Sequence, residues 1–111
     1  MHDLDKRIAE LKGYDLVVMD QTRAERPDFP ENGEFFRWST SDAKAFELVD
    51  ELNTQFFIER FGNPIIWAAV FLYRNNALHE KDFRSEGKTR AEAICRAYIA
   101  AKEWMATKAG A

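Results

Sequence analysis

The sequence has few of the residues that mark several common classes of protein. Its 111 residues include one cysteine, which excludes an internal disulfide and is typical of a reducing cytosol. Its five glycines are scattered singly, so the chain has no glycine-rich loop to hold a phosphate. The longest nearly apolar run, residues 65–73, is about half the length of a membrane-spanning helix, and no signal-peptide segment opens the chain. We therefore expect a soluble protein of the cytoplasm.

The charge balance is also mild. The formal net charge of -3 lacks the basic excess of a nucleic-acid binder, and the carboxylates do not gather in the dense runs of a DNA mimic. Hydrophobic residues make up 46% of the chain, which indicates a folded core in spite of 32% charged residues. At this length we expect a single domain, residues 1–111, whose core needs no disulfide or metal.

Patterns in the first third of the chain predict one helix and one hairpin. Apolar residues recur at helical spacing over residues 4–11, with Asp3 as the expected N-cap. The segments YDLVVMD (14–20) and EFFRW (34–38) read as strands and are predicted to pair as a hairpin. The polar segment between them, residues 21–33, contains two prolines and is predicted to be a long loop, a common place for functional residues.

The rest of the chain is predicted to hold a helix, a hairpin, an edge strand and a final helix. Their expected ranges are residues 39–52, 54–61 with 65–73, 77–83, and from residue 89 onward. Ser39 is the expected N-cap of the first of these helices. Thr89 and Glu92 form a capping box for the last one.

The strand over residues 65–73 carries most of the fold prediction. Both of its faces are apolar, which is typical of a strand that is covered on both sides. The predicted element order α-β-β-α-β-β-α, with hairpins in place of crossovers, indicates a mostly antiparallel sheet of four or five strands. The expected fold is α+β, a three-layer αβα sandwich with helices on both faces of the sheet.

Cys95 is the residue that most resembles a nucleophile, because it is the only thiol. It falls within the apolar stripe of the last helix, which runs through Ala91, Ile94, Tyr98, Ala101 and Met105. A catalytic thiol requires a base and partial exposure, whereas free cysteines are usually buried. We therefore expect Cys95 to be a core residue.

No other group of residues in the sequence predicts a reaction or a bound metal. His79, Glu80 and Asp82 have the side chains of metal ligands but not the spacing of a metal site, and His2 lies far away in the sequence. We expect them to form a solvated segment. No catalytic residue, metal or cofactor is therefore predicted, and the chain is expected not to be an enzyme.

Two groups of residues are candidates for binding. Arginines lie beside aromatic residues in or near the predicted strands, where they could stack on a nucleotide base or simply extend over apolar surface. The long loop offers exposed cationic and aromatic side chains for a protein partner. The six candidates from both groups are Arg23, Arg26, Phe29, Arg37, Arg60 and Arg74.

Three segments resemble the phage ABA (alpha-beta-alpha) sandwich domain family, a set of small phage and prophage proteins. They are LDKRIAE with GY (4–10 and 13–14), WSTSD with AFELV (38–42 and 45–49), and EAICRA (92–97). The second segment carries one inserted serine, and the loop and residues 53–88 depart from the family pattern. The resemblance implies an αβα sandwich and a phage or prophage origin in the bacterial cytoplasm. It implies no catalytic residues.

These observations favour a phage accessory protein that acts by non-enzymatic binding to a host or defence-system protein, as a counter-defence inhibitor does. The alternative is a protein that binds, sequesters or processes nucleotides, for which Arg37, Arg60 or Arg74 would have to converge in one pocket. A homodimer is also left open, because Trp104 near the end of the last helix would suit an interface.

Overall fold

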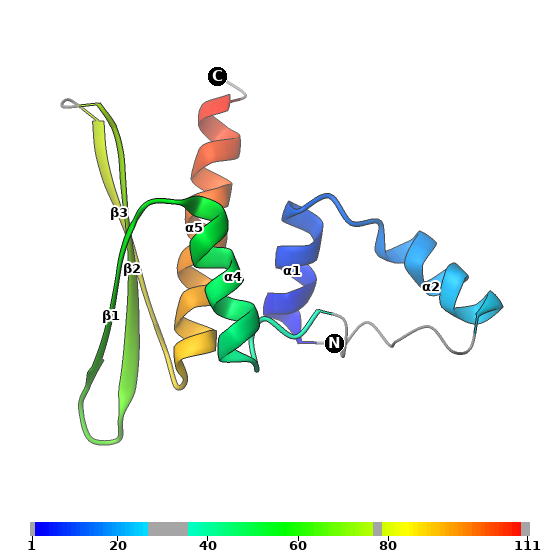
Figure 1. Cartoon of the computed structure of the whole chain (residues 1–111), viewed down its shortest axis with the longest axis horizontal. Coiled ribbons are helices and arrows are strands. Elements are labelled where there is room, and N and C mark those ends of the chain that lie inside the picture. The colour runs from blue at the N-terminus through cyan, green and yellow to red at the C-terminus, as the bar shows by residue number, and fades with distance from the viewer. Residues whose placement is uncertain (1, 27–35, 77–78, 110–111) are drawn as a thin grey trace.

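The chain folds into four helices and three strands over the residues that the structure describes. A computed structural model describes residues 2–26, 36–76 and 79–109 (Figure 1). The helices are α1 (Asp3–Leu11), α2 (Leu16–Glu25), α4 (Asp42–Leu52) and α5 (Arg90–Ala109). The strands are β1 (Gln55–Phe61), β2 (Ile66–Asn76) and β3 (His79–Gly87). The class is therefore α+β, as predicted.

The three strands form one antiparallel sheet in the order β1-β2-β3, with β2 at the centre. Phe56 of β1 lies opposite Phe71 of β2, which lies opposite Phe83 of β3. The predicted hairpin and edge strand are thus confirmed, with β3 continuing beyond the expected residue 83 to Gly87. Four or five strands were expected, however, and the described residues form only three.

The predicted first hairpin is wrong. Where residues 14–20 were expected to form a strand, the chain forms α2, whose N-cap Asp15 accepts a hydrogen bond from the Val18 backbone amide at 3.1 Å. The four apolar residues that follow Asp15 are too short a run to distinguish a strand from a helix, and the cap decides the outcome. The described part of 34–38 is a turn segment, and residues 21–25 of the expected loop are helical.

The three-layer sandwich is also not found. In Figure 1 the helices lie together to one side of the sheet, and α5 packs across β2 and β3. Helix α4 packs against α5, α1 lies beyond them, and α2 extends farthest from the sheet. Among the described elements, none covers the other side of the sheet.

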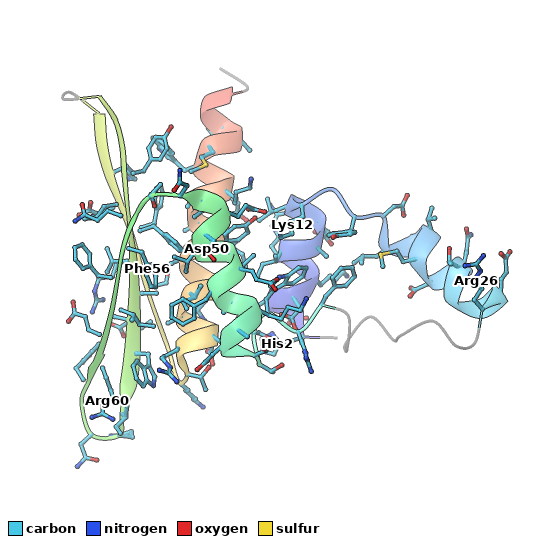
Figure 2. The ribbon with its side chains drawn as sticks, viewed as in Figure 1. His2, Lys12, Arg26, Asp50, Phe56 and Arg60 are labelled. Carbon is cyan, nitrogen blue, oxygen red and sulfur yellow. The ribbon has the colours of Figure 1, made fainter. Side chains whose placement is uncertain are left out.

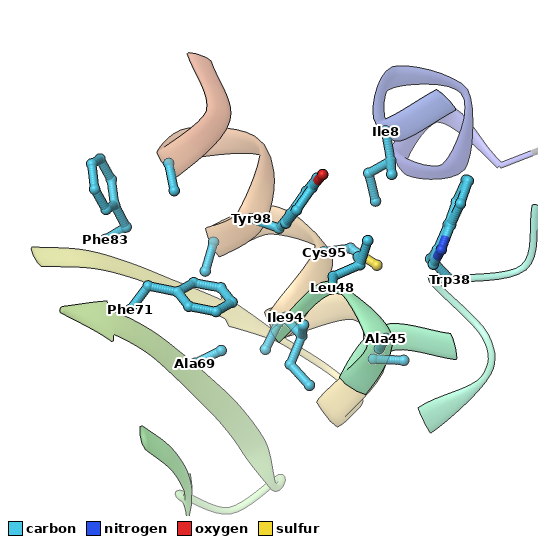
Figure 3. Close-up of a cluster of buried hydrophobic side chains, with 14 of the residues drawn as sticks. Ile8, Trp38, Ala45, Leu48, Ala69, Phe71, Phe83, Ile94, Cys95 and Tyr98 are labelled. Carbon is cyan, nitrogen blue, oxygen red and sulfur yellow. The ribbon is translucent and has the colours of Figure 1, made fainter. Parts of the chain in front are cut away.

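The core lies between the sheet and α5 and continues past α5 toward α1. Figure 3 shows Phe71 and Phe83 on the sheet side of α5, with Ile8 and Trp38 on the opposite side. The apolar stripe predicted for α5 is confirmed, because its residues from Ala91 to Ala101 are buried and Met105 packs against them. One long helix therefore organises both halves of the core.

A buried carboxylate joins α1 to the start of α4. Asp5 is only 3% exposed, and its two oxygens accept hydrogen bonds from the Ser39 backbone amide at 2.8 Å and the Ser39 hydroxyl at 2.9 Å. Ser39 is therefore not the N-cap that its sequence context predicts. Ser41 is the cap, and its hydroxyl accepts from the Lys44 amide. His2, rather than Asp3, caps α1.

Candidate functional site

The side of the sheet that faces away from the helices is a surface that the core does not use. Side chains alternate between the two faces of a strand, so the ladder assigns each residue to one side. We call the uncovered side the outer face. Its members with described side chains are Gln55, Phe57, Glu59 and Phe61 of β1, Ile66, Ala68, Val70 and Leu72 of β2, and Asp82, Arg84 and Glu86 of β3.

The centre of the outer face is apolar and partly exposed. Phe57 is 47% exposed and Phe61 is 38% exposed, although both belong to strands. On β2, Val70 lies opposite Phe57 and Ile66 lies opposite Phe61, and both are half-buried. Exposed apolar residues that are contiguous, rather than single, are typical of an interaction surface.

Ala68 is one of the four apolar residues, with Ile66, Val70 and Leu72, from which a covering layer was predicted on this side of β2. It is fully buried, yet it does not belong to the core cluster between sheet and helices. The guanidinium of Arg84 lies 5.7 Å from the Phe61 ring centroid, so these two side chains reach toward each other across β2. They cover the small Ala68 side chain from the two neighbouring strands. The cation–π contact between Arg84 and Phe61 thus keeps Ala68 away from solvent, a role that was expected of a covering helix.

Carboxylates flank the apolar centre on both edges. On β3, Glu86 forms an ion pair with Arg84 at 2.8 Å, which leaves the charge of that pair balanced. Asp82 on the same strand and Glu59 on β1 are exposed. Among the side chains that the structure describes on the outer face, the balance is therefore acidic.

A signal for this surface is present in the sequence of β3. In β3, charged Asp82, Arg84 and Glu86 alternate with Phe83 and Ser85. Such alternation is typical of an antiparallel sheet that has one face packed on the core and the other face solvated. The apolar appearance of β2 concealed this signal.

The six candidates predicted from the sequence are not brought together. Arg26 at the end of α2 and Arg60 on β1 lie at opposite ends of the molecule (Figure 2). Arg60 lies opposite Trp67, seven residues along β2 from Arg74, so their backbones are about 23 Å apart. Arg37 is exposed in the segment before α4. Phe29 lies outside the described residues, as do the side chains of Arg23 and Arg74.

Arg60 does contact an aromatic ring, but on the helix side of the sheet. Its guanidinium lies 6.0 Å from the Trp67 ring centroid, and that of Arg90 lies 5.2 Å from the same ring. Arg90 also forms an ion pair with Asp42 at 2.7 Å. Through these contacts β1, β2, α4 and α5 are joined at one end of the fold, and Arg60 contributes packing there.

Cys95 is buried in the core, as predicted. Burial raises the pKa of its thiol far above the ordinary value, and the nearby carboxylates of Asp5 and Glu92 raise it further. A thiol with a raised pKa carries almost no thiolate at neutral pH. The described residues also contain no group of three His, Cys, Asp or Glu side chains placed to hold a metal.

Glu51 is the centre of a polar network that joins three helices. Its carboxylate accepts hydrogen bonds from the buried Tyr98 hydroxyl of α5 and from the Lys12 ammonium that follows α1. Burial acts to raise the pKa of the Glu51 carboxyl, but the hydrogen bonds from Lys12 and Tyr98 outweigh it. The net effect is a pKa below the ordinary value of 4.5.

This network predicts a pH dependence of stability. Because the pKa of Glu51 is lower in the folded than in the unfolded chain, its contribution is complete above the unfolded pKa and is lost as the pH falls through the folded pKa. The difference in unfolding free energy between wild type and Glu51→Gln should therefore be constant from pH 7 to about 5 and shrink below about 4.5. Urea unfolding at a series of pH values measures it. An unchanged difference at pH 3 would contradict the assignment.

Over the described residues, the fold is α+β, with a three-stranded antiparallel sheet that has helices on one face and an uncovered second face. Comparisons with protein-family models, with curated proteins and with solved structures find no match to this chain. Within the described residues, no helix is both long enough and apolar enough to cross a membrane.

Proposed function

We propose that this chain is a small non-enzymatic binding protein whose outer face docks a partner protein. The observation that carries the proposal is the sheet itself, with helices on one side and exposed Phe57 and Phe61 on the other. Partly exposed aromatic residues are enriched where proteins bind one another, because a large ring buries much area with little loss of entropy.

The biological setting of the proposal comes from the resemblance to the phage ABA sandwich domain family. In that setting the chain is a phage or prophage accessory protein in the cytoplasm of the bacterial host. Its partner is a host or defence-system protein, and the chain acts as a counter-defence inhibitor. A role in binding nucleotides is less favoured, because that alternative requires a convergence of arginines, and Arg60 and Arg74 are about 23 Å apart along the sheet.

Photo-crosslinking in the bacterial host tests the docking surface. A photoreactive amino acid is placed at position 57 on the outer face or at position 50, an exposed site on α4 among the helices (Figure 2). We expect one protein to crosslink at position 57 and not at position 50. Equal crosslinking at both sites, or none at position 57, would contradict the proposal.

A matched pair of substitutions supplies the control. Phe57→Ser should abolish capture of that protein, whereas Phe46→Ser, at a partly exposed phenylalanine on α4, should preserve it. Circular dichroism of both variants confirms that the fold is kept. Loss of capture in both variants would show that the outer face has no special role.

A further inference from the structure

The dimensions of the outer face fit a single helix. Along β2, the apolar residues extend from Ile66 to Leu72, which is about 20 Å at the rise of a strand. Across the sheet, the two outer strands are about 10 Å apart. An α-helix is about 10 Å wide, and about 14 residues of helix are about 21 Å long. One amphipathic helix of that length would cover the apolar centre.

The charges of the outer face select the kind of helix. Glu59 lies on one edge strand and Asp82 on the other, and both carboxylates are exposed. Arg84 cannot offset them, because it is paired with Glu86 and lies over Phe61. A helix that laid its apolar stripe on β2 would bring the residues beside that stripe close to Glu59 and Asp82. Lysine or arginine at those positions can bury its stem on the sheet and place its charge at a carboxylate.

The same charges disfavour a second copy of this chain on the outer face. Two copies packed face to face would bring the carboxylates of Glu59 and Asp82 from both molecules into one interface. Like charges placed together in an interface oppose association. The charges therefore disfavour a second copy as the occupant, although the apolar centre alone would permit it.

We propose that the outer face binds a basic amphipathic helix of about 14 residues, with its apolar stripe on β2 and its cationic residues against Glu59 and Asp82. The inference deepens the proposed function and rests on it, since it names the chemistry of the partner for the same surface. The partner segment is recognised by its shape and charge, in the manner of a helix that docks into a groove.

Synthetic peptides test this inference directly. One peptide carries leucines at helical spacing with lysines on both sides of the stripe. A second replaces each lysine by glutamate, and a third scrambles the order of the first. Fluorescence anisotropy should show binding of the first peptide alone, with a gain of helical circular dichroism and an affinity that falls at high salt. Equal binding of the scrambled peptide would show that net charge alone, and not an amphipathic helix, causes the binding, and it would overturn the inference.

Charge reversals on the protein locate the binding. Glu59→Lys and Asp82→Lys should each weaken binding of the basic peptide by about fivefold, the size of one rim ion pair. Asp50→Lys on α4 makes the same change in net charge on the helix side and should leave the affinity nearly unchanged. All three residues are exposed, so the variants are expected to keep the fold. Equal weakening in all three would overturn the placement of the helix.

The peptide experiment and the crosslinking experiment can fail separately. If the basic peptide does not bind while a host protein still crosslinks at position 57, the helix chemistry is wrong and the docking surface stands. If the basic peptide binds but is insensitive to Glu59→Lys and Asp82→Lys, it binds elsewhere and the inference is wrong. A crosslinked dimer formed through position 57 would show that a second copy of this chain occupies the outer face, and the inference of a basic helix would then be wrong.

Discussion

Replacing Phe71 by alanine is expected to lower the free energy of unfolding by about 4 kcal/mol. Phe71 is almost fully buried in the central strand, and its ring centroid lies 5.1 Å from that of Phe56. The register places Phe83 on its other side, beneath α5. Truncation removes a ring from the centre of the sheet–helix contact and leaves a cavity that neighbours on three elements would have to fill.

Urea unfolding of the wild type and of Phe71→Ala measures this loss. Since small domains are stable by only about 5–15 kcal/mol, this loss is a large fraction of the total, and the variant should unfold at a clearly lower urea concentration than the wild type. Phe71→Leu keeps most of the volume and should cost about 1 kcal/mol. A loss below about 1 kcal/mol for Phe71→Ala would show that the sheet does not pack on α5 as described.

Replacing Asp5 by alanine is expected to cost about 3 kcal/mol. The change removes both acceptors of Ser39, and it leaves the buried Ser39 amide and hydroxyl without these hydrogen bonds. Loss of a charged hydrogen-bond partner from a buried site is more costly than loss of a surface bond. The segment that leads into α4 should then detach from α1.

Two further variants separate this bond from general effects on α1. Asp3→Ala changes an exposed carboxylate in the first turn of the same helix and should cost about 0.5 kcal/mol. In a double-mutant cycle, Asp5→Ala and Ser39→Ala should be non-additive, because both remove the bond from the Ser39 hydroxyl to Asp5, while the bond from the Ser39 amide is lost only in Asp5→Ala. Additive losses would contradict a direct bond between the two residues.

The elements with strong local signals were predictable from the sequence. Periodicity predicted α1, and a capping box predicted the start of α5, where the Glu92 amide donates to the Thr89 hydroxyl at 3.1 Å. The hairpin of β1 and β2 was predicted from two apolar strands around a turn. These features depend on residues close in sequence, which is why a single sequence reveals them.

Helix α2 was missed although its cap is local, whereas two other missed features depend on contacts between distant residues. Ser39 looks like a helix cap, but Asp5, which lies 34 residues earlier in the chain, binds it. β2 looks covered on both faces, but Phe61 and Arg84 from the neighbouring strands shield Ala68. Such pairings are visible only in the tertiary structure. The open face of the sheet, which is the candidate site, could therefore not be predicted from the sequence of β2 alone.

Phe56 and Phe57 provide the most direct test of the central claim, that one face of the sheet is covered and the other is open. They are neighbours in β1 and point to opposite faces, with Phe56 packed between Phe71 and Phe46 and Phe57 on the outer face. Urea unfolding of Phe56→Ala and Phe57→Ala compares the two faces with the same chemical change. We expect a loss of about 2–3 kcal/mol for Phe56→Ala and less than about 1 kcal/mol for Phe57→Ala. Equal losses of about 3 kcal/mol would mean that the chain covers both faces, as in a three-layer sandwich, and would contradict the account.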